Sequence, residues 1–266
     1  MGRFDGYLLC SDLDGTLLDD EKRISRGNIE AIEYFKAEGG KFTFCTGRVV
    51  DGVRYVLEYV RPNVPMICFN GAAIYDFETE KYLHTKPLCN LAPDAVSYIY
   101  DLLPNAAIDV CTAYDSFFCR TNRILERHKT LEHLKDNYVD FRDIKGEWMK
   151  VIFMTEPEEL REVREAFKNY PHTDKFDFVQ SCENYYEMLP KASGKGYGLK
   201  ELVKILNADM SKTIGIGDNF NDIDFVRTAG IGAAVKNAED EVKKAADIVV
   251  DADNNSDALK SLIMSL

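Results

Sequence analysis

Two aspartates, one residue apart, follow the first apolar run of the chain. Asp12 and Asp14 come directly after residues 7–10, and Gly15-Thr16 then turns the chain. A buried parallel strand would deliver both carboxylates to its carboxyl end, which is where open α/β sheets bind their ligands. Because Asp and Gly are also ordinary turn residues, this interpretation depends on complementary groups at the ends of later strands.

Such groups follow the next two apolar runs, 41–45 and 65–69. They are Thr46, Gly47, Arg48, Asn70 and Gly71. A hydroxyl beside the start of a helix is a natural anion site, because free backbone N–H groups point the same way. Thr46 could equally be a simple helix N-cap.

A second polar group lies near the C-terminus. Asp218, Asn221 and Asp222 follow the apolar run 212–216, and Lys195 lies near the start of an expected helix at 197–206. A cation at a helix N-terminus is disfavoured by the helix dipole unless an anion lies between them. Lys195 is therefore a functional candidate, although most lysines are simply solvated.

Together these residues suggest phosphoryl chemistry at a metal. The four aspartates would bring several negative charges close together, which is costly without a compensating cation. Carboxylate ligands without His or Cys point to Mg²⁺. Thr46 and Lys195 add donors suited to a phosphate dianion, and transfer of a phosphoryl group to an aspartate is a known form of covalent catalysis.

The ordered set of motifs resembles that of a known family. Asp12-x-Asp14-Gly-Thr, Thr46-Gly-Arg48, Lys195 and Gly217-Asp218-x-x-Asn221-Asp222 are similar to the four motifs of the haloacid dehalogenase superfamily of phosphohydrolases. The long insert between the second and third motifs, preceded by Asn70-Gly71, resembles the Cof-type branch with its large α/β cap.

The resemblance implies a role for each motif residue. Asp12 would be the nucleophile, and Asp14 the general acid and then the base for water. Thr46 and Lys195 would hold the phosphoryl group and Asn221 would touch it. Mg²⁺ would take Asp12, the main-chain carbonyl of Asp14, Asp218 and, directly or through water, Asp222. The remaining residues assigned to phosphate or substrate binding are Gly47, Arg48, Asn70 and Gly71.

The same reasoning predicts an α/β fold: a doubly wound, Rossmann-like parallel sheet with an inserted α/β cap. The core is expected at 1–83 and 191–266, and the cap, which would read the leaving group, at 84–190. Core strands are expected at 7–10, 41–45, 65–69, 212–216, 232–235 and 248–250, with helices at 24–38, 49–59, 197–206 and 239–246. Cap strands are expected at 107–111, 116–120, 149–154, 176–180 and 185–189, with helices at 91–103, 124–136 and 158–167.

The composition limits the kinds of partner that the protein is expected to bind. The 266 residues carry a net charge of −12 without a basic cluster, which argues against nucleic acid and anionic membranes as partners. The seven cysteines form no Cys-x-x-Cys pair, and no apolar stretch suits a signal peptide or a membrane span. A cytoplasmic location is expected.

The expected function is a Mg²⁺-dependent phosphatase for small phosphorylated metabolites, with sugar phosphates the expected class. A phosphotransferase or phosphomutase of the same superfamily would be distinguished by its products. A non-catalytic sugar-phosphate-binding regulator would show no turnover. Two tail segments depart from the family pattern, because Ala233-Ala234-Val235 lacks the usual methionine and Asn254-Asn255-Ser256-Asp257 lacks the usual Asp-Gly-Val.

Overall fold

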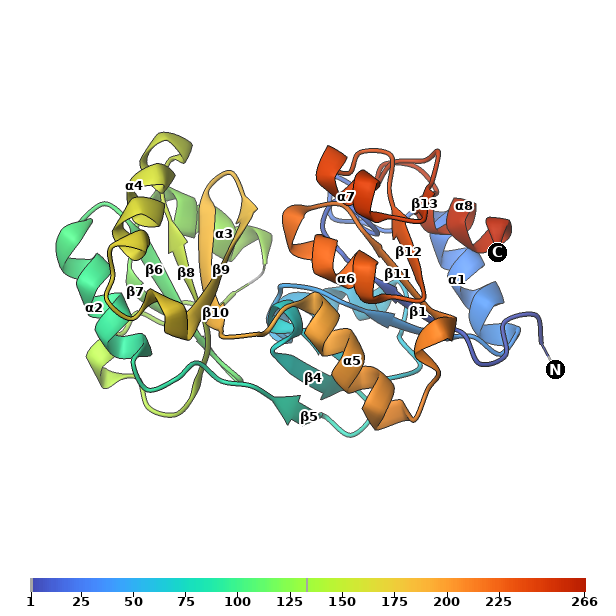
Figure 1. The fold of residues 1–266 in the computed structure, drawn as a ribbon, viewed down its shortest axis with the longest axis horizontal. Helices are drawn as coiled ribbons and strands as arrows, with labels where there is room; N and C mark the ends of the chain where they lie inside the picture. The colour runs from blue at the N-terminus through green and yellow to red at the C-terminus, as the bar shows by residue number, and fades with distance from the viewer. Residues whose placement is uncertain (1, 133) are drawn as a thin grey trace. The chain divides into compact units, whose positions relative to one another are not determined.

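The computed structural model describes residues 2–132 and 134–266, and its contacts divide the chain into two compact units. Unit 1 is Met1–Arg48, Arg54–His84 and Gly194–Leu266. Unit 2 is Val49–Val53 and Thr85–Ser193. Each unit has its own five-stranded sheet (Figure 1).

The sheet of unit 1 is parallel, in the order β13-β12-β11-β1-β2. Its strands are β1 (Leu8–Ser11), β2 (Lys41–Phe44), β11 (Thr213–Gly217), β12 (Ile231–Ala234) and β13 (Ile248–Val249). Every residue of β1 is buried, as expected of a central strand covered on both faces. The predicted Rossmann-like fold is therefore confirmed.

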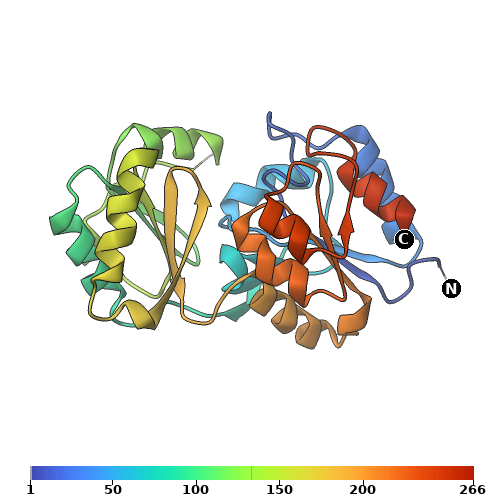
Figure 2. The ribbon, with the colours of Figure 1, turned by 45° about the horizontal axis from the view of Figure 1, so that its top comes forward.

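Helices cover both faces of this sheet. They are α1 (Arg26–Ala37), α5 (Lys195–Leu206), α6 (Ile223–Thr228), α7 (Asp240–Ala245) and α8 (Ala258–Ser265). The chain moves one way across the sheet from β1 to β2 and the other way from β11 to β12, so right-handed connections place α1 and α6 on opposite faces. Helix α8 packs beside α1, and α5 beside α6 (Figure 2).

A small antiparallel sheet, β3-β4-β5, follows the second motif. Its strands are β3 (Met66–Cys68), β4 (Ala73–Asp76) and β5 (Lys81–Thr85). The strand expected at 65–69 is thus shorter, and it joins the end of β2 only through a parallel bridge between Cys45 and Ile67. The helix expected at 49–59 is instead a 3₁₀ helix, η1 (Asp51–Glu58). Gly52 and several valines, all poor helix formers, account for the weaker structure.

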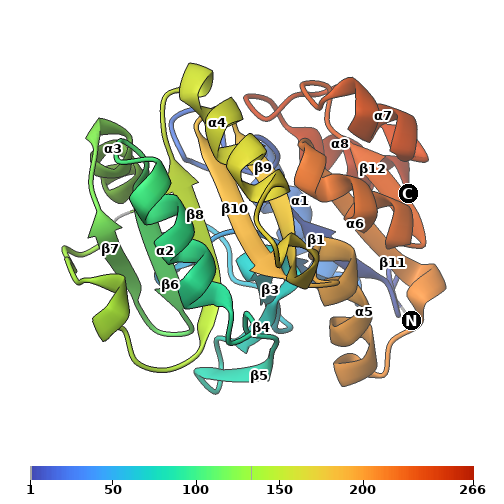
Figure 3. The same cartoon turned by 60° about the vertical axis from the view of Figure 1, so that its left-hand side comes forward.

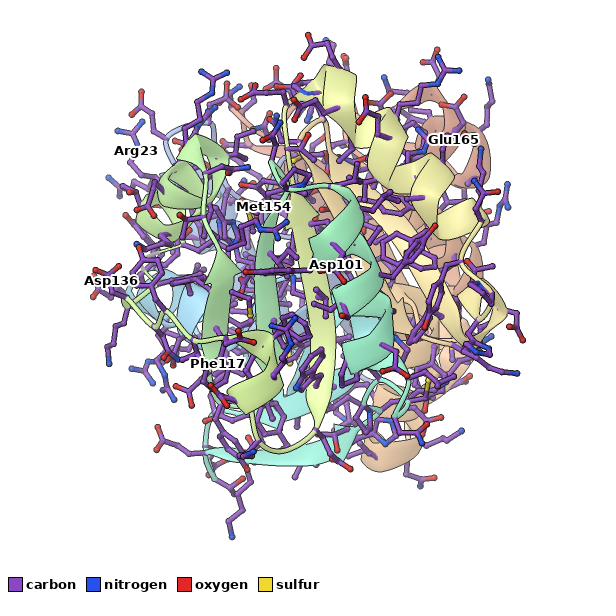
Figure 4. The ribbon with its side chains drawn as sticks, turned by 90° about the vertical axis from the view of Figure 1, so that its left-hand side faces the viewer. Arg23, Asp101, Phe117, Asp136, Met154 and Glu165 are labelled. Carbon is purple, nitrogen blue, oxygen red and sulfur yellow. The ribbon has the colours of Figure 1, made fainter. Side chains whose placement is uncertain are left out.

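Unit 2 has an antiparallel sheet in the order β7-β6-β8-β10-β9. Its strands are β6 (Ala107–Thr112), β7 (Ser116–Arg120), β8 (Trp148–Met154), β9 (Phe176–Cys182) and β10 (Tyr185–Pro190), and its helices are α2 (Ala92–Leu102), α3 (Arg123–Leu131) and α4 (Pro157–Lys168). Helices α2 and α4 lie over one face (Figure 3). Figure 4 shows that face, with Asp101 on α2 and Glu165 on α4.

The two faces of this sheet differ in chemistry. Apolar side chains of the α2 and α4 face form one core cluster, and α3 packs with a smaller one that includes Leu125 and Ile152. Asp109, Lys150 and Glu187 project on the same face as Ile152, because they occupy alternate strand positions in register with it. Charged groups therefore lie buried on the α3 face.

Some elements differ from the sequence expectation. Helix α3 ends at Leu131 rather than at residue 136; His133 lies outside the described residues. Strands β4 and β5 and helices α6 and α8 were not predicted. The remaining short 3₁₀ turns are η2 (Phe69–Gly71), η3 (Phe141–Asp143), η4 (Thr173–Lys175), η5 (Met210–Lys212) and η6 (Phe220–Asp222). Among the described residues, no helix has the length and apolar character needed to cross a membrane.

Candidate active site

Three strand ends bring the first polar groups together. Strand β1 pairs with β11 on one side and with β2 on the other, and Ser11 lies level with both Ile216 and Phe44. The residues that follow these strands therefore lie at one edge, which places Asp12 between Asp218 and Thr46. The backbone N–H of Asp12 continues the ladder, donating to the carbonyl of Ile216 at 3.0 Å.

Lys195 connects two of the aspartates. Its ammonium group, on the first residue of α5, donates to Oδ1 of Asp12 at 2.7 Å and to Oδ1 of Asp222 at 2.6 Å. All three side chains are buried. The other oxygen of Asp222 accepts from the backbone N–H groups of Asp218 and Asn219, both at 3.1 Å. Asp222 is thus bonded at both oxygens, whereas Oδ2 of Asp12 accepts no hydrogen bond from the described residues.

Asp218 lies against the turn that follows Asp14. Its Oδ1 accepts from Thr16 Oγ1 at 2.9 Å. Its other oxygen faces Gly15, where an added Cβ would come within 2.4 Å of Oδ2. Glycine at position 15, with φ of +77°, therefore leaves the space that the Asp218 carboxylate occupies.

The three carboxylates form a group suited to a metal ion. Ligand oxygens of Asp12, Asp218 and Asp222 all lie within 4.8 Å of one another. Burial raises the pKa of Asp12 to about 7, although Lys195 opposes the shift. Burial, with the charges of Asp12 and Asp222, also raises the pKa of Asp218 well above its ordinary value.

Neighbouring negative charges add to the effect of burial. Three closely spaced carboxylates, two of them buried, lie near a single ammonium group, that of Lys195, so two negative charges remain in excess. A divalent cation would balance them and replace the protons that the raised pKa values indicate. The donors are oxygens of Asp side chains, which suit Mg²⁺. The residues therefore fit the predicted ion.

Asp14 has a different environment. Arg48 donates two hydrogen bonds to its carboxylate, from Nε to Oδ2 and from Nη2 to Oδ1, both at 2.7 Å. Lys22 Nζ also donates to Oδ1, at 2.6 Å. Burial alone would raise the pKa of Asp14, but Arg48 and Lys22 hold it well below its ordinary value. In this arrangement Asp14 is a carboxylate.

The second motif meets the Asn70-Gly71 pair through a backbone bond. The N–H of Asn70 donates to the carbonyl of Thr46 at 3.1 Å, and Thr46 Oγ1 accepts from the N–H of Arg48 at 3.1 Å. Asn70 has φ of +52° and its Oδ1 accepts from Asn221 Nδ2 at 3.0 Å. A Cβ on Gly47 would lie 2.9 Å from that same Oδ1.

Gly71 completes this cluster. A Cβ at this position would lie 1.8 Å from the carbonyl oxygen of Gly194, next to Lys195. The site residues named from the sequence therefore all lie in unit 1.

Three further residues contact the site, and sequence reasoning did not single them out. Thr16 bonds Asp218, Lys22 bonds Asp14, and Asn237 Nδ2 donates to the carbonyl of Gly15 at 2.8 Å. Thr16 belongs to the first motif and could have been assigned. Lys22 is one charge in a polar turn, and Asn237 follows no motif, so neither carried a signal.

Comparison with known proteins identifies the family. Residues 9–263 match the haloacid dehalogenase-like hydrolases. The chain is 30% identical to the putative phosphatase YxeH of Bacillus subtilis over 93% of both chains, and 25% identical to the pyridoxal phosphate phosphatase YbhA of Escherichia coli over 97% of both. The solved structure of the HAD subclass IIB sugar phosphatase BT4131 superposes with a TM-score of 0.84 at 22% identity, covering 97% of this chain and 98% of that one.

The match spans nearly the whole sequence, and it agrees with the parallel sheet and the edge cluster described above. The resemblance inferred from the motifs is confirmed: the chain belongs to the haloacid dehalogenase-like hydrolases.

Proposed function

We propose that this enzyme is a Mg²⁺-dependent phosphatase that hydrolyses small phosphorylated metabolites through an aspartyl-phosphate at Asp12. The observation that carries the proposal is the buried cluster in which Asp12 contacts Lys195 beside two further carboxylates. A simple structural ion pair would not need three closely spaced carboxylates beside one ammonium group. A site that receives a phosphate dianion and a divalent cation would.

The first half-reaction transfers the phosphoryl group to the enzyme. A carboxylate oxygen of Asp12 attacks phosphorus, the bond to the leaving oxygen breaks, and that oxygen takes a proton from Asp14. Lys195 and Thr46 donate to the phosphoryl oxygens and so stabilise the charge that develops on them. In the second half-reaction Asp14 takes a proton from water, which attacks phosphorus and releases inorganic phosphate from Asp12.

Mg²⁺ would be held by Asp12, the main-chain carbonyl of Asp14 and Asp218. When bound, it would reduce the repulsion between the Asp12 carboxylate and the phosphate dianion. Asp222 is already bonded at both oxygens, which supports an indirect role for it. Asn221, whose side-chain amide donates to Oδ1 of Asn70, would contact and orient the phosphate.

Unit 2 is proposed to act as the cap that selects the leaving group. The named relatives support a small phosphorylated substrate, since one is a pyridoxal phosphate phosphatase and the solved structure is that of a sugar phosphatase. Sugar phosphates are the class we expect for this enzyme. Selection would rest on side chains of unit 2, since the motif residues read only the phosphate and the metal.

A panel of phosphorylated metabolites, assayed for inorganic phosphate, tests the proposal. We expect turnover with Mg²⁺, its loss in excess EDTA, and recovery when Mg²⁺ is restored. Release of inorganic phosphate separates hydrolysis from transfer to a second sugar position. Absence of turnover across the panel with Mg²⁺ would leave the regulator as the better interpretation.

Asp12→Asn provides the specific test of the nucleophile. The amide is nearly isosteric but cannot attack phosphorus, so turnover should fall to background. The fold should persist, because Lys195 keeps Asp222 as its counterion. Thermal unfolding of the variant should resemble that of the wild type, and appreciable residual activity in a clean preparation would rule out the covalent route.

A further inference from the structure

The turn that carries Lys22 has a defined and strained backbone. Within it, the N–H of Asp19 donates to the carbonyl of Arg23 and the N–H of Lys22 to the carbonyl of Asp19, both at 2.9 Å. The Asp19 carboxylate also accepts from the N–H groups of Glu21 and Arg23. Lys22 itself has φ of +62°, a left-handed conformation that is unfavourable for residues with a Cβ.

The tail segment that departs from the family pattern fixes this turn. Asn254 Nδ2 donates to Oδ1 of Asp20 at 3.0 Å and to the carbonyl of Leu18 at 3.2 Å. Asn255 Nδ2 donates to Oδ2 of Asp20 at 3.1 Å, and its own oxygen accepts from the N–H of Asp20, also at 3.1 Å. Two residues far away in the sequence, Asn254 and Asn255, thus hold the turn in place.

The anchored turn directs the Lys22 ammonium group at one oxygen of Asp14. Oδ1 accepts from Lys22 at 2.6 Å and from Arg48 at 2.7 Å, while Arg48 also bonds Oδ2. The carboxylate cannot rotate without losing at least one charge-assisted hydrogen bond. Arg48 is buried, whereas the side chains of Lys22 and Asp14 are 31% and 40% exposed.

An ordinary surface ion pair does not account for this arrangement. Exposed ion pairs add little to stability, so such a pair would do no more than offset the strain at Lys22. Glycine would adopt the same backbone conformation at no such cost. The feature that distinguishes lysine here is its contact with Asp14.

We propose that Lys22 is a positioning residue for the reaction: together with Arg48 it orients the Asp14 carboxyl group for proton transfer. The inference rests on the proposed function, in which Asp14 serves the leaving group and then water. In this proposal, Asn254 and Asn255 stabilise the turn that carries Lys22.

The test compares Lys22→Met with Lys22→Arg and with Arg23→Met as the matched control. Methionine matches the lysine side chain out to Cε but lacks the ammonium group, and its Cβ imposes the same backbone constraint. Arg23 lies on the same turn, but its side chain contacts Asp19 and Glu21 rather than Asp14. The probes are phenyl phosphate and para-nitrophenyl phosphate, which have similar shapes but leaving groups of different quality.

For Lys22→Met we expect the transfer step with phenyl phosphate to slow by about 10-fold or more, part of the 10²–10⁴-fold that a positioned acid supplies. Transfer from para-nitrophenyl phosphate should slow less, because its leaving group needs little help. KM should stay within about twofold, since the contact is not with substrate. Lys22→Arg should restore most of the rate, and Arg23→Met should resemble the wild type.

Equal losses with both probes, a rise in KM without a change in transfer rate, or a Lys22→Met variant equal to its control would each overturn the inference. Wild-type turnover reports separately on the proposed function. Crystal structures of wild type and Lys22→Met give a readout that does not require activity. An unmoved Asp14 carboxyl group in the variant would contradict the positioning role even if neither protein turned over.

Discussion

At the scale of single residues, the proposed mechanism requires Asp14 to change its protonation state. In the described arrangement two cations keep its pKa low, so it holds no proton. To protonate a leaving group it must carry one when substrate is bound. A phosphate dianion would compete with the Asp14 carboxylate for Arg48, and this competition is the kind of change that substrate binding can supply.

Replacing Asp14 with Asn therefore tests its role through the leaving group. A sugar alkoxide or phenolate should lose about 10²–10⁴-fold in the transfer step, the usual contribution of a general acid. Transfer from para-nitrophenyl phosphate should fall much less. Hydrolysis of the aspartyl-phosphate should slow with either substrate, because it needs Asp14 as base. Rapid-mixing measurements should thus show a burst of nitrophenol followed by a slow steady state.

Equal losses in the transfer step for both substrates would contradict this assignment and would make Asp14 a metal-site or structural residue. Metal titration of the variant is the control, since Mg²⁺ is expected to contact only the main-chain carbonyl of Asp14 and should bind it as before.

The sequence could predict contacts that depend on strand ends but not contacts that depend on turn geometry. Asp12, Thr46 and Asp218 each follow an apolar run, and parallel pairing was enough to place them at one edge. Lys22 reaches Asp14 through a left-handed backbone and a turn bonded to Asn254. Neither feature leaves a periodic trace in the sequence, so the contact required the structure.

Elements were predicted best where burial imposes a pattern. The expected run 7–10 corresponds to β1, shifted by one residue, because a strand buried on both faces is mostly apolar. Strand β5 alternates exposed and half-buried residues at the edge of the small sheet, so its signal was weak. Helix α8 depends on tertiary bonds, such as that from the N–H of Lys260 to Asn28 Oδ1 at 3.1 Å.

At this scale, Gly71 marks a close approach between η2 and the start of α5. It ends η2, with φ of +91°, and an added Cβ would lie 1.8 Å from the carbonyl of Gly194 at the start of α5. Gly71→Ala should therefore lower the free energy of unfolding by more than about 2 kcal/mol, the sum of backbone strain and a clash with main chain. Urea unfolding measures it.

Gly6→Ala is the matched control, since Gly6 has φ of +84° and a Cβ there would meet the flexible end of Lys212 at 3.3 Å. It carries the strain without the clash, so its loss of stability should be clearly smaller. Equal losses for the two variants would mean that the approach of η2 to α5 contributes nothing.

The two units differ, at the scale of the whole molecule, in what their buried charges do. In unit 1 the buried carboxylates surround Lys195 at the proposed site. In unit 2, Lys150 Nζ and Glu187 Oε2 form an ion pair at 3.1 Å with both side chains buried. Nearby, neither oxygen of the buried Asp109 has a hydrogen-bond partner among the described residues. The stability of unit 2 should therefore depend on whether His128, which lies beside Asp109, is protonated.

His128 on α3 is buried between Asp109 and Glu132, with nitrogen to oxygen distances of 3.8 Å to each, and the ring of Tyr185 packs against it. Burial alone would lower the pKa of His128, and Lys150 adds to this, but Glu132 and Asp109 outweigh them and raise it above its ordinary value of 6.5.

A raised folded-state pKa of His128 means that the protonated ring stabilises the fold below pH 6.5, and that this stabilisation is lost as pH rises through the folded-state value. Hydrogen exchange in β6 and α3 should therefore quicken, relative to unit 1, as pH rises above 6.5, after correction for the intrinsic rate. His128→Gln should abolish that difference and His172→Gln, at an exposed position, should keep it; a pH response that survives in His128→Gln would assign the effect to another group.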